Sequence, residues 1–401
     1  MAGSRLGLKG SIGVPMNRET PTMLPSSFFR LLVSCALLPV ALCAATVEER
    51  LAQLEARLAT LTEQNTALQK QLEAATKKDS AAIVTAGGKV KKLSVGGYIQ
   101  VNGETGDAAD DRFPSSDRLL IRRARLTVKG SFAEDIDFTF QSEFGNGNLA
   151  ANTNYRAQLS DLFVTWKKYE AANLTLGQFK TPYGYEQLIA DTKNPFIERS
   201  LPNDRLTLSR QIGAMVSGKA PGGRVNYSAG FFNGNGVNNG ANDNEDFLLV
   251  GRVSATALKS EKAELTVGTN AFTTDDGVGT AAIQRDGFGF DAQFTAGKFV
   301  SAIEWLRTDT DRLTAADTTA EGWSAYASYP LVANILRGAV RYETYDPNTS
   351  VSADDFSTWT VGLIYTLKGD DLKFSLNYLL GDPAGSTRNQ GRLLGQAQII
   401  F

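Results

Sequence analysis

Basic side chains at alternating positions are the clearest chemical pattern in this sequence. Arg123 and Arg125 are two residues apart and Lys129 follows four residues later, so all three share one side of an extended strand. A row of such cations attracts anions, and the paired N–H groups of arginine suit phosphate oxygens. The pattern predicts that this face filters or binds anions.

The sequence offers little for covalent catalysis. Histidine is absent, which removes the usual general base and the commonest metal ligand. The two cysteines, Cys35 and Cys43, both lie in an apolar N-terminal stretch. We therefore expect no enzyme activity, no cofactor and no metal site. The formal net charge of −2 gives no reason to expect a nucleic-acid partner.

The basic row belongs to a long region of alternating side chains, residues 93–401, which predicts an all-β fold. It divides into sixteen strand-length segments, joined alternately by turns of about two to five and loops of about nine to 25 residues. The predicted strands begin near Leu93, Asp117, Glu134, Ala157, Ala172, Leu206, Arg224, Asp246, Lys262, Arg285, Phe299, Glu321, Ile335, Asp355, Asp371 and Gly391. This rhythm is typical of a 16-stranded antiparallel transmembrane β-barrel.

The alternation of apolar and polar side chains agrees with a sheet that has lipid on one face and water on the other. In the third segment Ile136 and Phe138 share one side, while Asp137 and Thr139 share the other. A spanning sheet must close because lipid offers no partners to backbone N–H and C=O groups. The alternative is a soluble β-sandwich, which has no reason to alternate short and long connections.

Residues 1–45 precede this region and resemble a secretory signal peptide. Arg30 is followed by an apolar stretch and then by Ala44 and Ala45, where we expect cleavage. Met23 would start a leader of ordinary length, so residues 1–22 are a candidate misassigned start. Modification at Cys35, as in a lipoprotein, is the alternative.

Residues 46–76 predict a coiled coil. Leucines recur at spacings of four and three, with Asn65 at one core position. Residues 77–92 are small, polar and lysine-rich, as in a linker. The short turns of a bacterial barrel face the periplasm. The helix precedes the first strand at this end of the barrel, so we expect it to lie in the periplasm. The alternative is an amphipathic helix that lies against the barrel mouth or peptidoglycan.

The third long loop, residues 181–205, differs from the others because it contains many apolar residues. Such a loop should be buried, and a sixteen-stranded barrel has room for it in the lumen. We expect it to narrow the channel; the alternative is that it covers the rim or a subunit contact. The candidate constriction residues are Lys180, Tyr183, Lys193, Arg199 and Arg205.

Strand parity predicts which charges face the lumen. The candidate pore-lining residues are Arg123, Arg125, Lys129, Lys167, Arg252, Arg337, Arg341, Asp161 and Glu304, with Lys373, Asp137, Glu143, Glu264, Asp291 and Glu343 on the same face. Eight of these are basic and seven acidic, so the charges alone leave ion selectivity open. Arg122 and Arg210 fall on the nominal lipid face, which requires either a place near the rim or a bulge.

Several short runs resemble the phosphate-selective porin O and P family of outer-membrane channels. They are Arg122 to Leu126 with Gly130, Gly177 to Tyr183, Ser209 to Gly213, Gly251 to Val253, and Tyr365 with the terminal Phe401. The resemblance spans the barrel. It implies a trimeric sixteen-stranded porin with an inward third loop, and some members prefer phosphate.

Together these patterns predict an outer-membrane porin through which small hydrophilic solutes diffuse passively, with a preference for anions such as phosphate left open. The expected partners are these solutes, outer-membrane lipid and two further copies of the chain. The alternative is an outer-membrane anchor or cell-wall tether whose barrel is mainly structural.

Overall fold

The computed structural model describes residues 52, 55–64, 66, 92–145, 155–382, 384 and 390–401. The chain divides into two units, Met1–Lys78 and Asp79–Phe401. In the first unit residues 55–64 are helical, and Leu58 and Leu61 are exposed. The predicted signal peptide, the rest of the predicted coiled coil and nearly all of the predicted linker lie outside the described residues.

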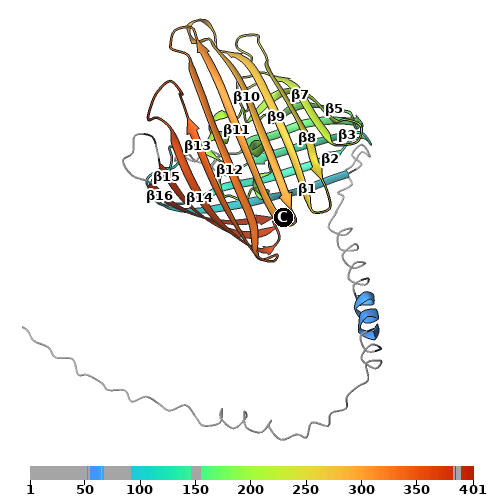
Figure 1. Ribbon diagram of the computed structural model, residues 1–401. Coiled ribbons are helices and arrows are strands. Elements are labelled where there is room, and N and C mark those ends of the chain that lie inside the picture. Colours follow the sequence, from blue (N-terminus) through green and yellow to red (C-terminus); the bar gives the residue numbers. More distant parts are fainter. Residues whose placement is uncertain are drawn as a thin grey trace, which may run out of the picture. The chain divides into compact units, whose positions relative to one another are not determined.

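In the second unit sixteen antiparallel strands form a closed barrel, which confirms the predicted fold (Figure 1). Each strand pairs with its neighbours in the sequence, and β1 pairs with β16 to close the ring. The strands are β1 (Lys92–Gly106), β2 (Arg118–Ser131), β3 (Ile136–Glu143), β4 (Gln158–Tyr169), β5 (Ala172–Lys180), β6 (Arg210–Lys219), β7 (Val225–Phe232), β8 (Leu248–Lys259), β9 (Ala263–Asp276), β10 (Ile283–Ala296), β11 (Phe299–Arg312), β12 (Thr318–Val332), β13 (Leu336–Asp346), β14 (Phe356–Lys368), β15 (Leu372–Asp382) and β16 (Gln390–Ile400).

The predicted alternation is visible in single strands. In β14, Trp359 and Val361 are 52% and 56% exposed, whereas Thr358 and Thr360 are each 1% exposed. The exposed row is apolar and the buried row polar, the reverse of a soluble protein, as expected where the outside is lipid and the inside is wet. Within the described residues, no helix has the length and apolar character needed to cross a membrane.

A bulge and a strand end explain the positions of two arginines that parity placed on the lipid face. The pairing of β1 with β2 shifts between Gln100 and Val101, so that Arg122 is an extra residue, and its side chain is buried. Arg210 is the first residue of β6, and its Nε lies 2.8 Å from Asp161 on β4. Neither side chain faces lipid: of the two explanations left open, the bulge applies to Arg122, and Arg210 lies at the end of its strand.

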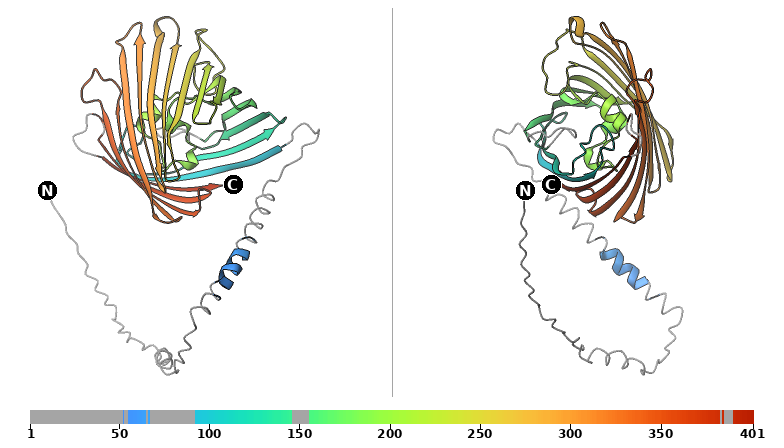
Figure 2. Two further views of the ribbon diagram at one scale, coloured as in Figure 1. Left: turned by 45° about the vertical axis from the view of Figure 1, so that its right-hand side comes forward. Right: turned by 90° about the vertical axis from the view of Figure 1, so that its left-hand side faces the viewer.

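The segment between β5 and β6, residues 181–209, is called loop L3 here. It contains α2 (Tyr185–Leu188), the 3-10 turn η1 (Asp191–Lys193) and α3 (Leu201–Leu206). The right-hand view of Figure 2 shows this green segment inside the ring of strands, and α3 contacts β11, β12 and β13 on the far wall. The predicted strand start at Leu206 was four residues early, because α3 occupies Leu201–Leu206.

Candidate pore and constriction loop

Apolar packing attaches one side of L3 to the inner wall. Tyr183 is completely buried, and its ring meets that of Phe272 on β9 edge to face at a centroid distance of 4.8 Å. The cluster comprises Phe179, Tyr183, Leu206, Leu208, Phe232, Leu248, Val250, Phe272 and Leu306. It fills the lumen along β5, β7, β8, β9 and β11, so the remaining space lies elsewhere around the loop.

Polar side chains of the wall accept hydrogen bonds from the backbone of L3. Glu304 on β11 accepts from the N–H groups of Tyr185 and Glu186. Glu343 on β13 accepts from the Leu201 N–H at 3.0 Å, and Asn377 on β15 from the Ile197 N–H at 2.8 Å. Buried N–H groups need such partners. Glu304 and Glu343 therefore hold the loop in addition to lining the lumen.

Asp191 of L3 is the centre of an ion-pair cluster. Its carboxylate lies 2.6 Å from the guanidinium nitrogens of both Arg125 and Arg199 and 3.7 Å from Arg123, and it accepts from the Tyr98 hydroxyl at 3.1 Å. Burial alone would raise its pKa, but Arg199, Arg123 and Arg125 outweigh burial and hold the pKa well below the usual value. This carboxylate therefore stays charged and binds L3 to β2.

Glu198 makes a second attachment to the same strand. It lies 2.7 Å from Arg122 and 3.2 Å from Arg123. Burial opposes the charged form, but the arginines lower the pKa of Glu198 to about 2. Arg341 on β13, five strands from β2 around the ring, donates to the Glu198 carbonyl at 2.9 Å. L3 is therefore attached to two separate strands of the barrel wall.

A cavity of about 700 Å³ lies between L3 and β2 to β4, toward the long-loop end; we call it the outer cavity. Its charged lining consists of Arg122, Arg123, Arg125, Glu143, Arg156, Lys180, Arg199, Asp204 and Arg210. Seven of these described residues are basic and two acidic. Lys180 is engaged with the loop, since its Nζ donates to the carbonyls of Gln187 and Ile189. Arg156 is exposed, and no ion pair joins it to the described part of the chain.

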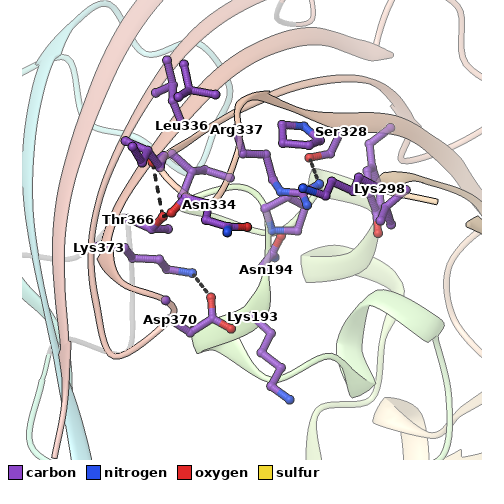
Figure 3. A pocket seen from close by; sticks show the side chains of 18 residues that line it. Lys193, Asn194, Lys298, Ser328, Asn334, Leu336, Arg337, Thr366, Asp370 and Lys373 are labelled. Carbon is purple, nitrogen blue, oxygen red and sulfur yellow. Dashed lines mark hydrogen bonds and ion pairs between the residues drawn. The ribbon is translucent and has the colours of Figure 1, made fainter. Parts of the chain in front are cut away.

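A second cavity of about 590 Å³ lies between L3 and β11 to β15, toward the short turns; we call it the inner cavity (Figure 3). Its charged lining consists of Lys193, Lys298, Arg337, Asp370 and Lys373. Residues 193–195 of L3 contribute to it. L3 thus takes part in both cavities, one toward each end of the barrel.

The other predicted lumen charges are mostly paired. Their closest partners are Asp291 for Arg252 (2.7 Å), Glu343 for Arg341 (2.5 Å), Asp137 for Lys167 (2.5 Å) and Arg210 for Asp161 (2.8 Å). Arg205 pairs with Asp111 at 2.6 Å in the loop after β1, away from both cavities. Lys129 is exposed on β2 and makes no ion pair within the described ranges.

The alternation of side chains along strands could not predict which charged residues on loops and turns lie inside the barrel. Arg112, after β1, is buried and lies 2.7 Å from both Asp110 and Asp204, which ties this loop to L3. Lys298, in the turn before β11, and Arg156, before β4, line the two cavities. The only signal in the sequence for these residues is their position beside a strand end, and this position does not indicate whether their side chains point into the lumen.

The fold recurs in solved outer-membrane proteins. DcaP, an outer-membrane channel of Acinetobacter baumannii, has a TM-score of 0.57 at 11% identity, over 80% of this chain and all of that chain. The anion-selective porin from Comamonas acidovorans has a TM-score of 0.55 at 15% identity, over 77% of this chain and 99% of that one. The trimer form of OmpT of Vibrio cholerae has a TM-score of 0.54 at 11% identity, again over 77% and 99%.

Sequence comparison gives the family. No curated protein matches the chain. The family described as phosphate-selective porin O and P matches residues 94–276 and 269–400, which together make up most of the chain and nearly the whole barrel. With its sixteen closed strands, its inward third loop and this match, the chain belongs to the phosphate-selective porin O and P family.

Proposed function

We propose that this outer-membrane porin, through which small hydrophilic solutes diffuse passively, prefers anions. The observation that carries the proposal is the sign of the charges that have no ion-pair partner. Arg156 in the outer cavity and Lys298 and Arg337 in the inner cavity have no carboxylate partner among the described residues. The carboxylates that line the cavities, Glu143, Asp204 and Asp370, are each paired with a basic side chain. Charges that line a narrow lumen determine ion selectivity.

Reversal potentials of the full protein in planar bilayers test this proposal. With a potassium chloride gradient, we expect the sign of the reversal potential to show that the channel is more permeable to chloride than to potassium. The preference should weaken at high salt, because screening shortens the reach of the lumen charges. Repeating the measurement in phosphate ranks phosphate against chloride. A potassium-selective reversal potential would refute the proposal.

Arg156 is the exposed cation among the described residues that line the outer cavity. We expect Arg156→Gln to lower the chloride conductance at low salt by up to about twofold, because an exposed cation attracts anions only over a Debye length. The free energy of unfolding of this variant should stay within about 0.5 kcal/mol of wild type, since the substitution breaks no ion pair in the described residues. Single-channel recording and chemical denaturation measure the two effects.

Lys262→Gln is the matched control for Arg156→Gln. Lys262 is an exposed lysine in the turn between β8 and β9 and lines neither cavity. It should change neither conductance nor stability. Equal conductance losses in both variants would mean that total charge, and not the outer cavity, causes the effect.

We further propose that three chains assemble and that residues 46–76 form a periplasmic coiled coil. The exposed Leu58 and Leu61 support this, because a coiled coil buries such leucines against a partner helix. The trimer form of Vibrio cholerae OmpT shows that a related barrel can assemble in threes. Light scattering of the detergent-solubilised protein gives the mass that decides the number of chains.

A further inference from the structure

The inner cavity holds cations that have little to neutralise them. Lys298, Arg337 and Lys373 come from the turn before β11, from β13 and from β15, and Asp370 is the one carboxylate among the described lining residues. Figure 3 shows Lys193 pointing away from Arg337, so Lys193 belongs to the edge of the cavity.

Two of these cations, Arg337 and Lys298, can still donate hydrogen bonds to a bound anion. Lys373 is engaged, since its Nζ donates to the Thr192 carbonyl at 2.6 Å and lies 3.5 Å from Asp370. Arg337 donates to the Ser328 hydroxyl at 3.1 Å and has no carboxylate partner in the described part of the chain. Because a guanidinium has five N–H donors, Arg337 can still bind a carboxylate. Lys298 is exposed and unpaired among the described residues.

The rest of the lining is unlike that of a filter for inorganic ions. Its apolar residues are Pro195, Val300, Pro330, Val332, Ile335, Leu336 and Ile364, and the ring of Tyr326 joins them. An inorganic anion gains no binding free energy from contact with apolar side chains, and this contact removes part of its hydration water. A cavity of about 590 Å³ with apolar walls and a few placed cations has the size and character of a small-molecule site.

We propose that the inner cavity binds organic anions that carry an apolar body, of which aryl carboxylates are the simplest, as they pass L3. The carboxylate would meet Arg337 and Lys298, and the ring would lie against Val300, Pro330 and Ile364. This inference rests on the proposed preference for anions, and it names a substrate class for one part of the channel. The cavity faces the short turns, so the site is open to the periplasmic side.

Block of chloride current in planar bilayers tests the inference, with benzoate and acetate as probes. Both are monovalent carboxylates at neutral pH, so only the apolar body differs. Added on the short-turn side, benzoate should half-block the current at a concentration at least about tenfold below that of acetate, because its ring buries apolar surface.

Two variants separate the charge from the apolar wall. Arg337→Gln should raise the half-blocking concentration of benzoate about tenfold, through loss of the charge-assisted hydrogen bonds. Val300→Thr keeps the shape and adds a hydroxyl to the wall; it should weaken block by benzoate and leave that by acetate unchanged. Lys262→Gln, outside both cavities, should change neither.

The outcomes distinguish this inference from the proposed function. If chloride is preferred over potassium but benzoate blocks no better than acetate, the inner-cavity site is refuted and the anion preference stands. Stronger block by inorganic phosphate than by benzoate likewise refutes the organic-anion site. A channel that prefers potassium refutes both.

Discussion

Replacing Asp191 with asparagine should remove one of the two attachments of L3 to β2 and lower the free energy of unfolding by about 3–5 kcal/mol, the usual cost of removing one partner of a buried ion pair. The neutral amide would leave Arg123, Arg125 and Arg199 without their shared carboxylate. The side chain of Asp191 is only 4% exposed, so water cannot replace the lost charge. Denaturation in guanidinium, followed by tryptophan fluorescence, measures the loss.

The same variant should also conduct differently. Removing a negative charge beside the outer cavity raises its net positive charge, so we expect a stronger preference for chloride over potassium. Because L3 is less firmly held, the open-channel current should become noisier. Both readouts come from single-channel recording, and they separate an effect on the channel from a merely structural one.

Asp309→Asn is the matched control. Asp309 pairs with Arg307 at 2.8 Å, but both side chains are more than a third exposed, so losing the pair should cost about 1 kcal/mol or less. If Asp191→Asn were no less stable than this control and conducted like wild type, L3 would not depend on the Asp191 cluster.

The double substitution Arg123→Gln with Arg125→Gln should have the largest effect on selectivity. It removes two cations from the outer cavity and also leaves Asp191 and Glu198 with fewer partners. The local balance therefore changes twice, through lost positive charge and through uncovered negative charge. We expect the ratio of chloride to potassium permeability to fall by about tenfold.

Reversal potentials at low salt measure this change, and Lys262→Gln again serves as the control. Arg199 and Arg122 still hold one carboxylate each, so the barrel should still assemble. Resistance of the folded barrel to cold SDS checks the assembly. An unchanged permeability ratio in a correctly assembled variant would exclude this row of arginines from selectivity.

The barrel was predictable from sequence because each strand records its surroundings residue by residue. In β16 the outward row includes Leu393 and Ile399, and the inward row includes Gln396 and Gln398, as the alternation predicts. Fifteen of the sixteen strands begin within three residues of the prediction, and β6 begins four residues after it. The failures of parity at Arg122 and Arg210 arise at a bulge and at a strand end, which alternation cannot show.

The course of L3 was only partly predictable. Its apolar residues predicted burial, and Tyr183, Ile197 and Leu201 are buried. Its destination depends on partners far away in sequence, since Ile197 donates to Asn377, 180 residues later. No local pattern specifies such a pairing.

The residues alone determined the closed barrel, its strand number, the lipid-facing side of the strands away from bulges and strand ends, and the presence of a loop that must be buried. They did so because lipid and water impose a period of two on every strand. Which charges remain available was decided only by the tertiary structure. The near balance of lumen charges leaves unpaired cations in both cavities. The lining carboxylates Glu143, Asp204 and Asp370 are paired with basic side chains, whereas Arg156, Lys298 and Arg337 have no carboxylate partner among the described residues. Electrostatic pairing depends on distances between strands and loops, and those exist only once the barrel has closed around L3.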